Sequence, residues 1–399
     1  MAAIGGIVDF RNSSVDFGAV NAIRRAQALR GRGESTAYID SGVGMFYGAD
    51  DFSLDKQPIL SERRGYKAAL VMDSPFFDGR LAMEAYRAYG VEVVSMLDLP
   101  FALALYDSER RMLLLARDKK GKRPLYYCFK SGRVLFSSEP KGVLATKNEP
   151  IKINRDILSA HLTSPIGIYG ASDIYTDIFE VRCGECILFT EVGMSRFFYR
   201  GNTERRIKAK MPSPSNERAI SAFGDIDKKV LLSILDDALI AFDMPQFDAF
   251  MPSLCQIYMN VGGSQVSVFQ FKDAIKRRSL LYSYEREDRF NAFYGKAGIG
   301  IMPKIEESEY RQIEYENNRI LEVLTDIFFS MDRDGMLFLR GVFGDAKLNF
   351  LVSTLDKGRI KKEDTELYVR ILGMLYQAVE WSKLRNLELL SSEVGGFCV

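Results

Sequence analysis

The chain has 399 residues, and its 54 Lys and Arg residues balance 53 Asp and Glu residues to a formal net charge of +1 at pH 7. Because nucleic acids and anionic membranes are held by clustered cations, this balance gives no long-range field for either, and we expect neither as a partner. The hydrophobic fraction of 47% and the chain length predict a globular protein of two domains, and no apolar run approaches the ~20 residues that span a bilayer.

Residues 1–200 are expected to form one domain that is rich in strands. Short apolar runs broken by glycine or charged turns predict strands at residues 4–10, 68–72, 101–106, 112–116, 133–137 and 185–190. Helical periodicity predicts helices at residues 19–29, 80–89 and 156–162. This alternation indicates a layered α+β domain.

Residues 201–219 are polar and contain the segment MPSP at 211–214, which predicts a linker. Beyond it, residues 220–399 are expected to form a second, mainly helical domain. Apolar periodicity predicts helices at residues 227–242, 309–329 and 366–390. Two short apolar runs, 265–271 and 336–339, are interpreted as buried strands.

His161 is the only histidine, so the chain cannot build a metal cage from several imidazoles. Five cysteines are too sparse for a disulfide framework, and the N-terminus has no charged and then apolar leader. These features predict a cytoplasmic protein without a metal or other cofactor. Cys183 and Cys186 have C-x-x-C spacing, but a single pair without further ligands favours structural cysteines over a metal or redox site.

Three segments of the first half carry a specific pattern. Residues 99–107 (LPFALALYD), 113–127 (LLLARDKKGKRPLYY) and 135–139 (LFSSE) resemble asparagine synthetase of the glutamine-dependent type. Residues 4–10 and the turn 29–33 (LRGRG) are similar to further segments of that family. The alternative is a hairpin meander of any β-rich protein. The resemblance implies an N-terminal nucleophile fold, a four-layer αββα sandwich related to class II glutamine amidotransferases.

The chemistry that the resemblance implies is absent. In the family, a Cys follows the initiator Met and attacks glutamine, whereas Ala2 stands here and has no nucleophile. The family's Arg for the glutamine carboxylate falls within residues 45–50, which contain no Arg, and its oxyanion segment falls near residues 73–75. Asp73 and Asp78 remain as candidates for substrate binding. An engineered Cys-to-Ala change would explain Ala2 alone, so natural degeneration is the favoured interpretation.

The second half resembles the synthetase domain of the same family more weakly. Residues 251–257 stand where the family has the Ser-Gly-Gly-x-Asp-Ser loop that binds pyrophosphate, and Pro252 removes one N–H donor. Residues 339–345 (LRGVFGD) resemble its second loop, with Val342 and Phe343 in place of an acid and a glycine. The degenerate nucleotide loops therefore retain Ser253, Cys255, Gly341, Gly344 and Asp345.

The nucleophile, the Arg for glutamine and the pyrophosphate loop are missing together. This combination predicts a catalytically degenerate protein, a pseudoenzyme, that acts by binding. We expect it to be the partner or regulatory subunit of an active homologue, or a homo-oligomer. One alternative is an amide-forming ligase of the family that uses ATP and magnesium but not glutamine. A second is a module that binds a peptide or amino acid in the old substrate cleft, with Asp78 contacting the amine.

Overall fold

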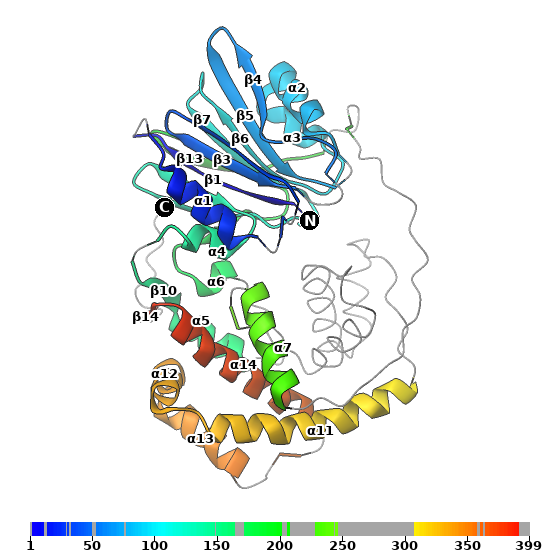
Figure 1. Ribbon diagram of the computed structural model, residues 1–399, viewed down its shortest axis with the longest axis vertical. Coiled ribbons are helices and arrows are strands. Elements are labelled where there is room, and N and C mark those ends of the chain that lie inside the picture. The colour runs from blue at the N-terminus through cyan, green and yellow to red at the C-terminus, as the bar shows by residue number, and fades with distance from the viewer. Residues whose placement is uncertain are drawn as a thin grey trace. The chain divides into compact units, whose positions relative to one another are not determined.

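Figure 1 shows the computed structural model of the chain. It describes residues 2–201 apart from 12, 13, 29, 32, 50–52, 76, 148 and 164–170, together with 206–207, 228–242, 244–245, 307–356, 360–361 and 364–390. These residues belong to two units, Met1–Glu149 with Asp177–Pro214, and Pro150–Thr176 with Ser215–Val399.

The first unit is built on two six-stranded sheets whose neighbouring strands are all antiparallel. The first sheet has the order β11-β8-β9-β1-β3-β2 and contains β1 (Ala3–Asp9), β2 (Ser35–Asp40), β3 (Val43–Gly48), β8 (Tyr126–Lys130), β9 (Arg133–Ser137) and β11 (Phe179–Glu180). The second has the order β13-β12-β7-β6-β5-β4 and contains β4 (Ile59–Arg63), β5 (Tyr66–Asp73), β6 (Ala102–Asp107), β7 (Met112–Arg117), β12 (Glu185–Thr190) and β13 (Gly193–Phe198). The predicted α+β class is confirmed.

The two sheets pack face to face and helices cover their outer faces. Alternation along β5 sends Val71 into the core between the sheets, whereas Leu70 packs with α2 (Gly79–Tyr89), η1 (Gly90–Glu92) and α3 (Val93–Met96). On the first sheet, α1 (Phe17–Ala26) packs Ile23 with Ile7 and Phe46. A short helix, α4 (Pro140–Leu144), follows β9. The layer order is therefore helix, sheet, sheet, helix.

Strand direction brings particular residues to one end of this sandwich, here called the Ala2 end. Ala3 of β1 is paired with Gly48 at the close of β3, and Gly5 is paired with Ser137 at the close of β9. In the second sheet, Asp73 at the close of β5 is paired with the first residue of β6. The loop after β7 leaves the sheet at the same end, because β7 runs antiparallel to β6.

The second unit consists of helices and one small parallel sheet among its described residues. The helices are α5 (Arg155–Thr163), α6 (Ala171–Ile174), α7 (Lys228–Phe242), α11 (Glu307–Phe329), α12 (Arg333–Phe343), α13 (Asp345–Asp356) and α14 (Thr365–Leu384). Strand β10 (Ile151–Asn154) pairs with β14 (Leu387–Leu390). In the core, the Trp381 ring meets the Tyr175 ring edge-on with centroids 5.8 Å apart, and Gln377 donates to the Leu235 carbonyl at 2.8 Å.

Several boundaries differ from the sequence predictions. Residues 150–176 were assigned to the first domain but pack in the second unit, because β10 finds its partner strand near the end of the chain. Residues 336–339 were expected to be a strand but lie in α12, where Asp332 caps the helix and Leu339 and Val342 lie on its buried face. The helix expected at 366–390 ends at Leu384, and its last residues form β14. The strand expected at 265–271 lies outside the described residues.

None of the helices in the described part of the chain is both long enough and apolar enough to cross a bilayer.

The buried His161 makes the second unit sensitive to acid. Its Nε2 lies 2.9 Å from the Pro245 carbonyl, and burial, with the nearby charge of Arg370, lowers its pKa to about 4 from 6.5. The unfolded chain therefore binds the proton first as the pH falls, so stability present above pH ~6.5 is lost towards pH ~4. At about 1.4 kcal/mol per pKa unit, the loss amounts to about 3 kcal/mol.

We expect His161→Gln, which keeps an N–H donor for Pro245, to remove this part of the acid sensitivity. Urea unfolding can be followed by the fluorescence of Trp381, the only tryptophan, which lies in the same unit. The natural chain and the variant should diverge between pH 7 and pH 4.5. Parallel curves for the two would contradict the assignment.

Candidate functional site

The chain enters the sandwich at Ala2, which is buried with an exposed fraction of 2%. The next residues are held by backbone and hydroxyl contacts. Ile4 donates its N–H to the Ser138 Oγ at 3.0 Å, and Ser138 donates its own N–H to the Ile4 carbonyl at 2.9 Å. The start of β1 is therefore fixed against the residues that follow β9.

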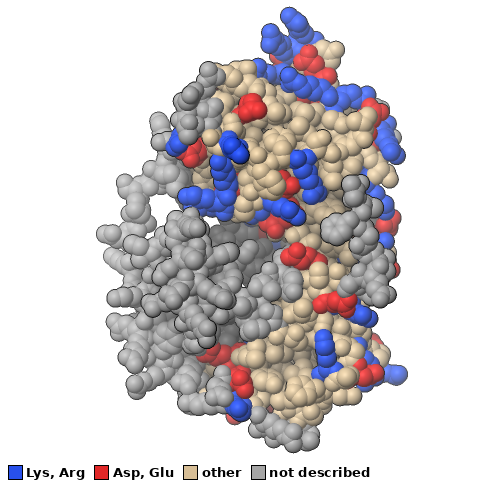
Figure 2. All heavy atoms as spheres, turned by 180° about the vertical axis from the view of Figure 1, so that it is seen from behind, with Lys and Arg blue, Asp and Glu red and all other residues tan. Residues whose placement is uncertain are grey.

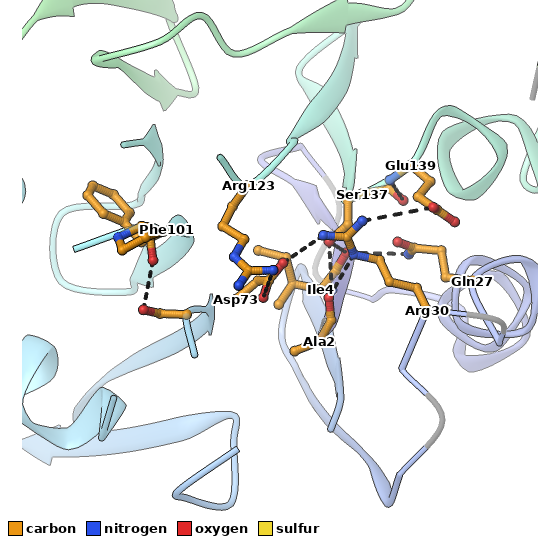
Figure 3. A network of polar contacts seen from close by, with 12 residues as sticks. Ala2, Ile4, Gln27, Arg30, Asp73, Phe101, Arg123, Ser137 and Glu139 are labelled. Carbon is orange, nitrogen blue, oxygen red and sulfur yellow. Dashed lines mark hydrogen bonds and ion pairs between the residues drawn. The ribbon is translucent and has the colours of Figure 1, made fainter. Parts of the chain in front are cut away.

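Arg30 is the centre of a buried polar network beside Ala2 (Figure 3). Its Nε donates to the Ala2 carbonyl at 2.8 Å, and its Nη2 donates to the Asp73 Oδ2 at 2.7 Å. Its Nη1 lies 3.9 Å from the Glu139 Oε1, and all three charged side chains are only 1% exposed. One guanidinium thus connects the start of β1, the end of β5 in the other sheet and the segment after β9.

Two further cations complete the network. Arg123 places its Nη1 3.9 Å from the Asp73 Oδ1, and the Lys141 Nζ lies 3.0 Å from the Glu139 Oε2. The five side chains comprise three cations and two carboxylates, so each buried carboxylate faces more than one positive charge. Burying an ion without such partners would cost several kcal/mol.

This geometry differs from a nucleophile site. The Ala2 side chain is a methyl group, which cannot attack a carbonyl. At the position where the family's carboxylate-binding Arg is expected, Met45 is fully buried in the core between the sheets. Asp73 lies in the network as an ion-pair partner of Arg30. The Ala2 end of the sandwich therefore holds a buried network of ion pairs.

Asp78 has a local role in the structure. It caps α2 by accepting the Arg80 N–H at 3.0 Å and pairs with the Arg80 guanidinium at 2.7 Å. This hydrogen bonding lowers the pKa of the Asp78 carboxyl. The structure therefore places Asp73 and Asp78 in different surroundings. Asp73 pairs with Arg30, whereas Asp78 pairs with Arg80 and lies beside the Asp55 carboxyl.

A cavity of about 270 Å³ lies between residues of β2, of β3 and of the segment before β4. Its lining consists of Glu34, Thr36, Tyr47, Ala49, Ser53, Leu54, Asp55, Lys56 and Gln57. Asp55 Oδ2 accepts the Gly79 N–H at 2.7 Å, and burial raises the pKa of its carboxyl. Gln57 is locked to the backbone of Met72, which donates its N–H at 2.7 Å. A desolvated carboxyl that lines a cavity is typical of a binding site.

The structure gives less support to the other candidate sites from the sequence. Cys186 is buried, which raises the pKa of its thiol to about 12, while Cys183 is exposed. In the part of the chain that the structure describes, no three His, Cys, Asp or Glu side chains gather as a metal site would require. The expected nucleotide loop around Ser253 and Cys255 lies outside the described residues.

The second expected loop is a helix junction. Gly341 lies in α12, Gly344 ends that helix with a φ of 73°, and Asp345 begins α13. The Asp345 carboxylate pairs with the Arg340 Nε at 2.8 Å. Val342, which replaces an acid of the family loop, is buried in the second unit at 3% exposure.

Comparison with known proteins adds to this geometry. A family model described as a glutamine amidotransferase domain matches residues 76–200. A putative asparagine synthetase [glutamine-hydrolyzing] of Methanocaldococcus jannaschii is 26% identical over 114 residues, covering 28% of this chain and 22% of that protein. Asparagine synthetase [glutamine-hydrolyzing] 3 of Bacillus subtilis is 27% identical over 122 residues, covering 31% and 20%. The match thus spans about a fifth of these relatives' length.

A search of solved structures finds a glutamine phosphoribosylpyrophosphate amidotransferase of Bacillus subtilis, with a TM-score of 0.33, 14% identity and 50% of each chain covered. The segment that matches the glutamine amidotransferase domain, residues 76–200, lies largely in the first unit, with its sandwich of antiparallel sheets. More particularly, this chain carries an asparagine synthetase-like glutamine amidotransferase domain.

Arg30 is expected to be the side chain on which the first unit most depends. Arg30→Met leaves Asp73 and Glu139 buried with one charge partner fewer, which should cost about 3–5 kcal/mol of unfolding free energy. Urea unfolding followed by circular dichroism measures the loss. Arg80→Met, which removes the exposed partner of Asp78, is the matched control and should change stability much less, because solvent screens an exposed ion pair.

A double variant separates charge from packing. Adding Asp73→Asn to Arg30→Met removes one stranded carboxylate, so the double variant should be more stable than Arg30→Met alone. If Arg30→Met and Arg80→Met destabilise the chain equally, the network is not the anchor described above.

Proposed function

We propose that this chain is a catalytically degenerate relative of asparagine synthetase that acts by binding, as the partner or regulatory subunit of an active homologue. The observation that carries the proposal is Ala2 itself. It stands at the buried start of β1, where the family resemblance implies a Cys nucleophile, and the Arg30 guanidinium holds its carbonyl. The scaffold that positions residue 2 is retained while the reacting atom is missing.

The other positions of the binding chemistry support the same proposal. Met45 fills the core where the resemblance implies an Arg, and the expected second nucleotide loop is a junction between α12 and α13. A phosphate loop needs several free N–H groups that converge on one point. Residues of α12 donate their N–H groups within the helix instead, which also disfavours a ligase that uses ATP and magnesium.

The purified chain is expected to release no glutamate or ammonia from glutamine. The informative variant is Ala2→Cys, with removal of Met1 verified by mass spectrometry. Because Met45 offers no charge to the glutamine carboxylate, the restored thiol should still give no hydrolysis above the enzyme-free rate. Glutaminase activity of the natural chain would overturn the proposal, and activity of Ala2→Cys alone would show that only the nucleophile was lost.

The binding role needs its own measurement. The chain, tagged at an internal surface site, is recovered from its native cells and the mass of its complex is determined. We expect a complete synthetase homologue, with Cys at its second position, to be recovered with it. Recovery of the chain alone would contradict the role of a partner subunit.

The 270 Å³ cavity favours a second candidate function, the binding of a free amino acid. Its lining contains the Asp55 carboxyl, which could receive an ammonium group, and the exposed pair of Lys56 with Glu34 at 3.6 Å, whose cation could receive a carboxylate. Asp78, which the sequence suggested as the amine contact, does not belong to this lining. Known ligand pockets begin at about 300 Å³, so the volume suits a small ligand.

We expect one or more free amino acids to raise the melting temperature of the natural chain, since a ligand that binds only the native state stabilises it. Asp55→Asn keeps an acceptor for the Gly79 N–H but removes the charge, and should abolish the shift. Asp98→Asn, which changes an exposed carboxyl outside the cavity lining, is the control and should retain it. If none of the twenty amino acids, tested at about 10 mM, shifts the melting temperature of the natural chain or of Asp98→Asn, this candidate is dismissed.

A further inference from the structure

Cations are the only exposed charged side chains in three neighbouring, fully described segments of the first unit. These segments are residues 118–125 after β7, residues 181–184 before β12 and residues 199–201 after β13. The Gly184 N–H donates to the Asp118 carbonyl at 3.1 Å, and the Tyr199 N–H donates to the Gly184 carbonyl at 3.1 Å, so the three segments are contiguous. Their exposed charged residues, called the basic surface below, are Lys119, Lys120, Lys122, Arg182 and Arg200.

The acids of these segments are turned inward or neutralised. Asp118 is 4% exposed and accepts the N–H groups of Lys120 at 3.0 Å and Arg123 at 3.3 Å, which folds the loop. Glu185 is 2% exposed and accepts the Arg182 N–H at 2.7 Å. Glu180, on β11 next to the turn, pairs with the buried Arg117 at 2.6 Å.

The loop is held in a fixed shape under its lysines. Gly121 has a φ of 60°, and a Cβ there would lie 2.3 Å from the Cys183 Sγ, so only glycine fits. The Lys119 ammonium lies over the Tyr199 ring, 5.7 Å from its centroid. The backbone that carries the cations is therefore preorganised, which lowers the entropy cost of binding an anion.

At the opposite end of the sandwich, several cations pair with acids: Lys67 with Asp40 at 2.8 Å, Arg111 with Glu191 at 3.4 Å, and Lys130 with Glu149 at 3.3 Å. Arg63 and Arg133 are exposed at the same end. Figure 2 shows Lys and Arg side chains grouped on the part of the molecule that the first unit forms, with Asp and Glu beside several of them. Clustered cations without such partners repel one another at separations below the ~8 Å Debye length.

Two kinds of polyanion could relieve this repulsion, and the structure favours protein carboxylates over nucleic acid. The aromatic ring at the basic surface, Tyr199, already has contacts on all sides. Its hydroxyl donates to the Arg117 carbonyl at 3.1 Å, the Lys119 ammonium covers one face of the ring, and the ring packs against the core below α2. It cannot stack on a base as single-strand binders require. The chain's net charge of +1 adds no wider field for a long polyanion.

We propose that the basic surface docks an acidic, Asp- or Glu-rich segment of the partner protein. Carboxylates spaced along an extended peptide can reach Lys120, Lys122 and Arg182 without any rearrangement of the loop. This inference rests on the proposed function, since it names the chemistry of the partner. The two fail separately, because glutaminase activity would overturn the function whereas peptide selectivity tests only the surface.

The test uses the full chain and a fluorescein-labelled peptide of alternating Glu and Ala, with a Gln-for-Glu peptide and a single-stranded oligonucleotide of equal charge as comparisons. Binding is followed by fluorescence anisotropy at low and physiological salt. The variant is Lys120→Glu, Lys122→Glu and Arg182→Glu combined, which spares Lys119 on Tyr199. The matched control, Arg63→Glu, Lys130→Glu and Arg133→Glu combined, makes the same change in net charge at the opposite end. Circular dichroism and melting temperature establish that both are folded.

We expect the natural chain to bind the Glu peptide more tightly than the Gln peptide. Its affinity for the Glu peptide should fall as the salt concentration rises. The basic-surface variant should lose at least about tenfold in affinity and the control less than about twofold. Equal losses in both variants would reduce the effect to net charge and overturn the inference. Tighter binding of the oligonucleotide than of the peptide, or no binding of the Glu peptide, would overturn it as well.

Discussion

The buried contact between Arg30, the Ala2 carbonyl and Asp73 is the constraint on which the first unit depends. A guanidinium that is 1% exposed cannot be solvated, so its donors must be satisfied by the three segments that converge on it. That requirement fixes the start of β1 relative to the end of β5 in the other sheet. The position of residue 2 is therefore set by electrostatics and burial, whatever side chain it carries, and an alanine fits there without disturbing the scaffold.

Much of this scaffold was predictable from local pattern, and the errors have physical causes. Several buried strands, such as β1 and β7, were predicted from the alternation of their residues or from a continuous apolar run. The edge strands β4 and β13 were not predicted, because an edge strand has fewer buried residues to mark it. Strand β3 was also not predicted although all its residues are buried, because Gly44 and Gly48 interrupt its apolar run. The run at 336–339 was misread because four apolar residues fit either a helix face or a strand, and only the Asp332 cap and the buried Leu339 and Val342 decide. Pairing of β10 with β14 joins residues more than 200 positions apart, which no local pattern contains.

The site was predictable only in part. The segments that carried the family resemblance, 29–33, 113–127 and 135–139, contain Arg30, Arg123 and Glu139, but the sequence did not show that these side chains meet. The interpretation of Ala2 as a replaced nucleophile came from its position together with the family resemblance, and it stays a prediction. Asp55 was overlooked, because a carboxyl in a loop has no spacing pattern, and its significance follows from burial and from the cavity that it lines.

Net charge is an equally incomplete guide to the surface. A balance of 54 cations against 53 acids excludes a long-range field, but it says nothing about which charges fold inward. Buried acids such as Asp118 and Glu185 accept hydrogen bonds from backbone N–H groups. A lysine side chain cannot take this role, because its ammonium group only donates. The cations beside them remain in water. A chain with a net charge of only +1 can in this way present a basic surface next to a buried network of ion pairs.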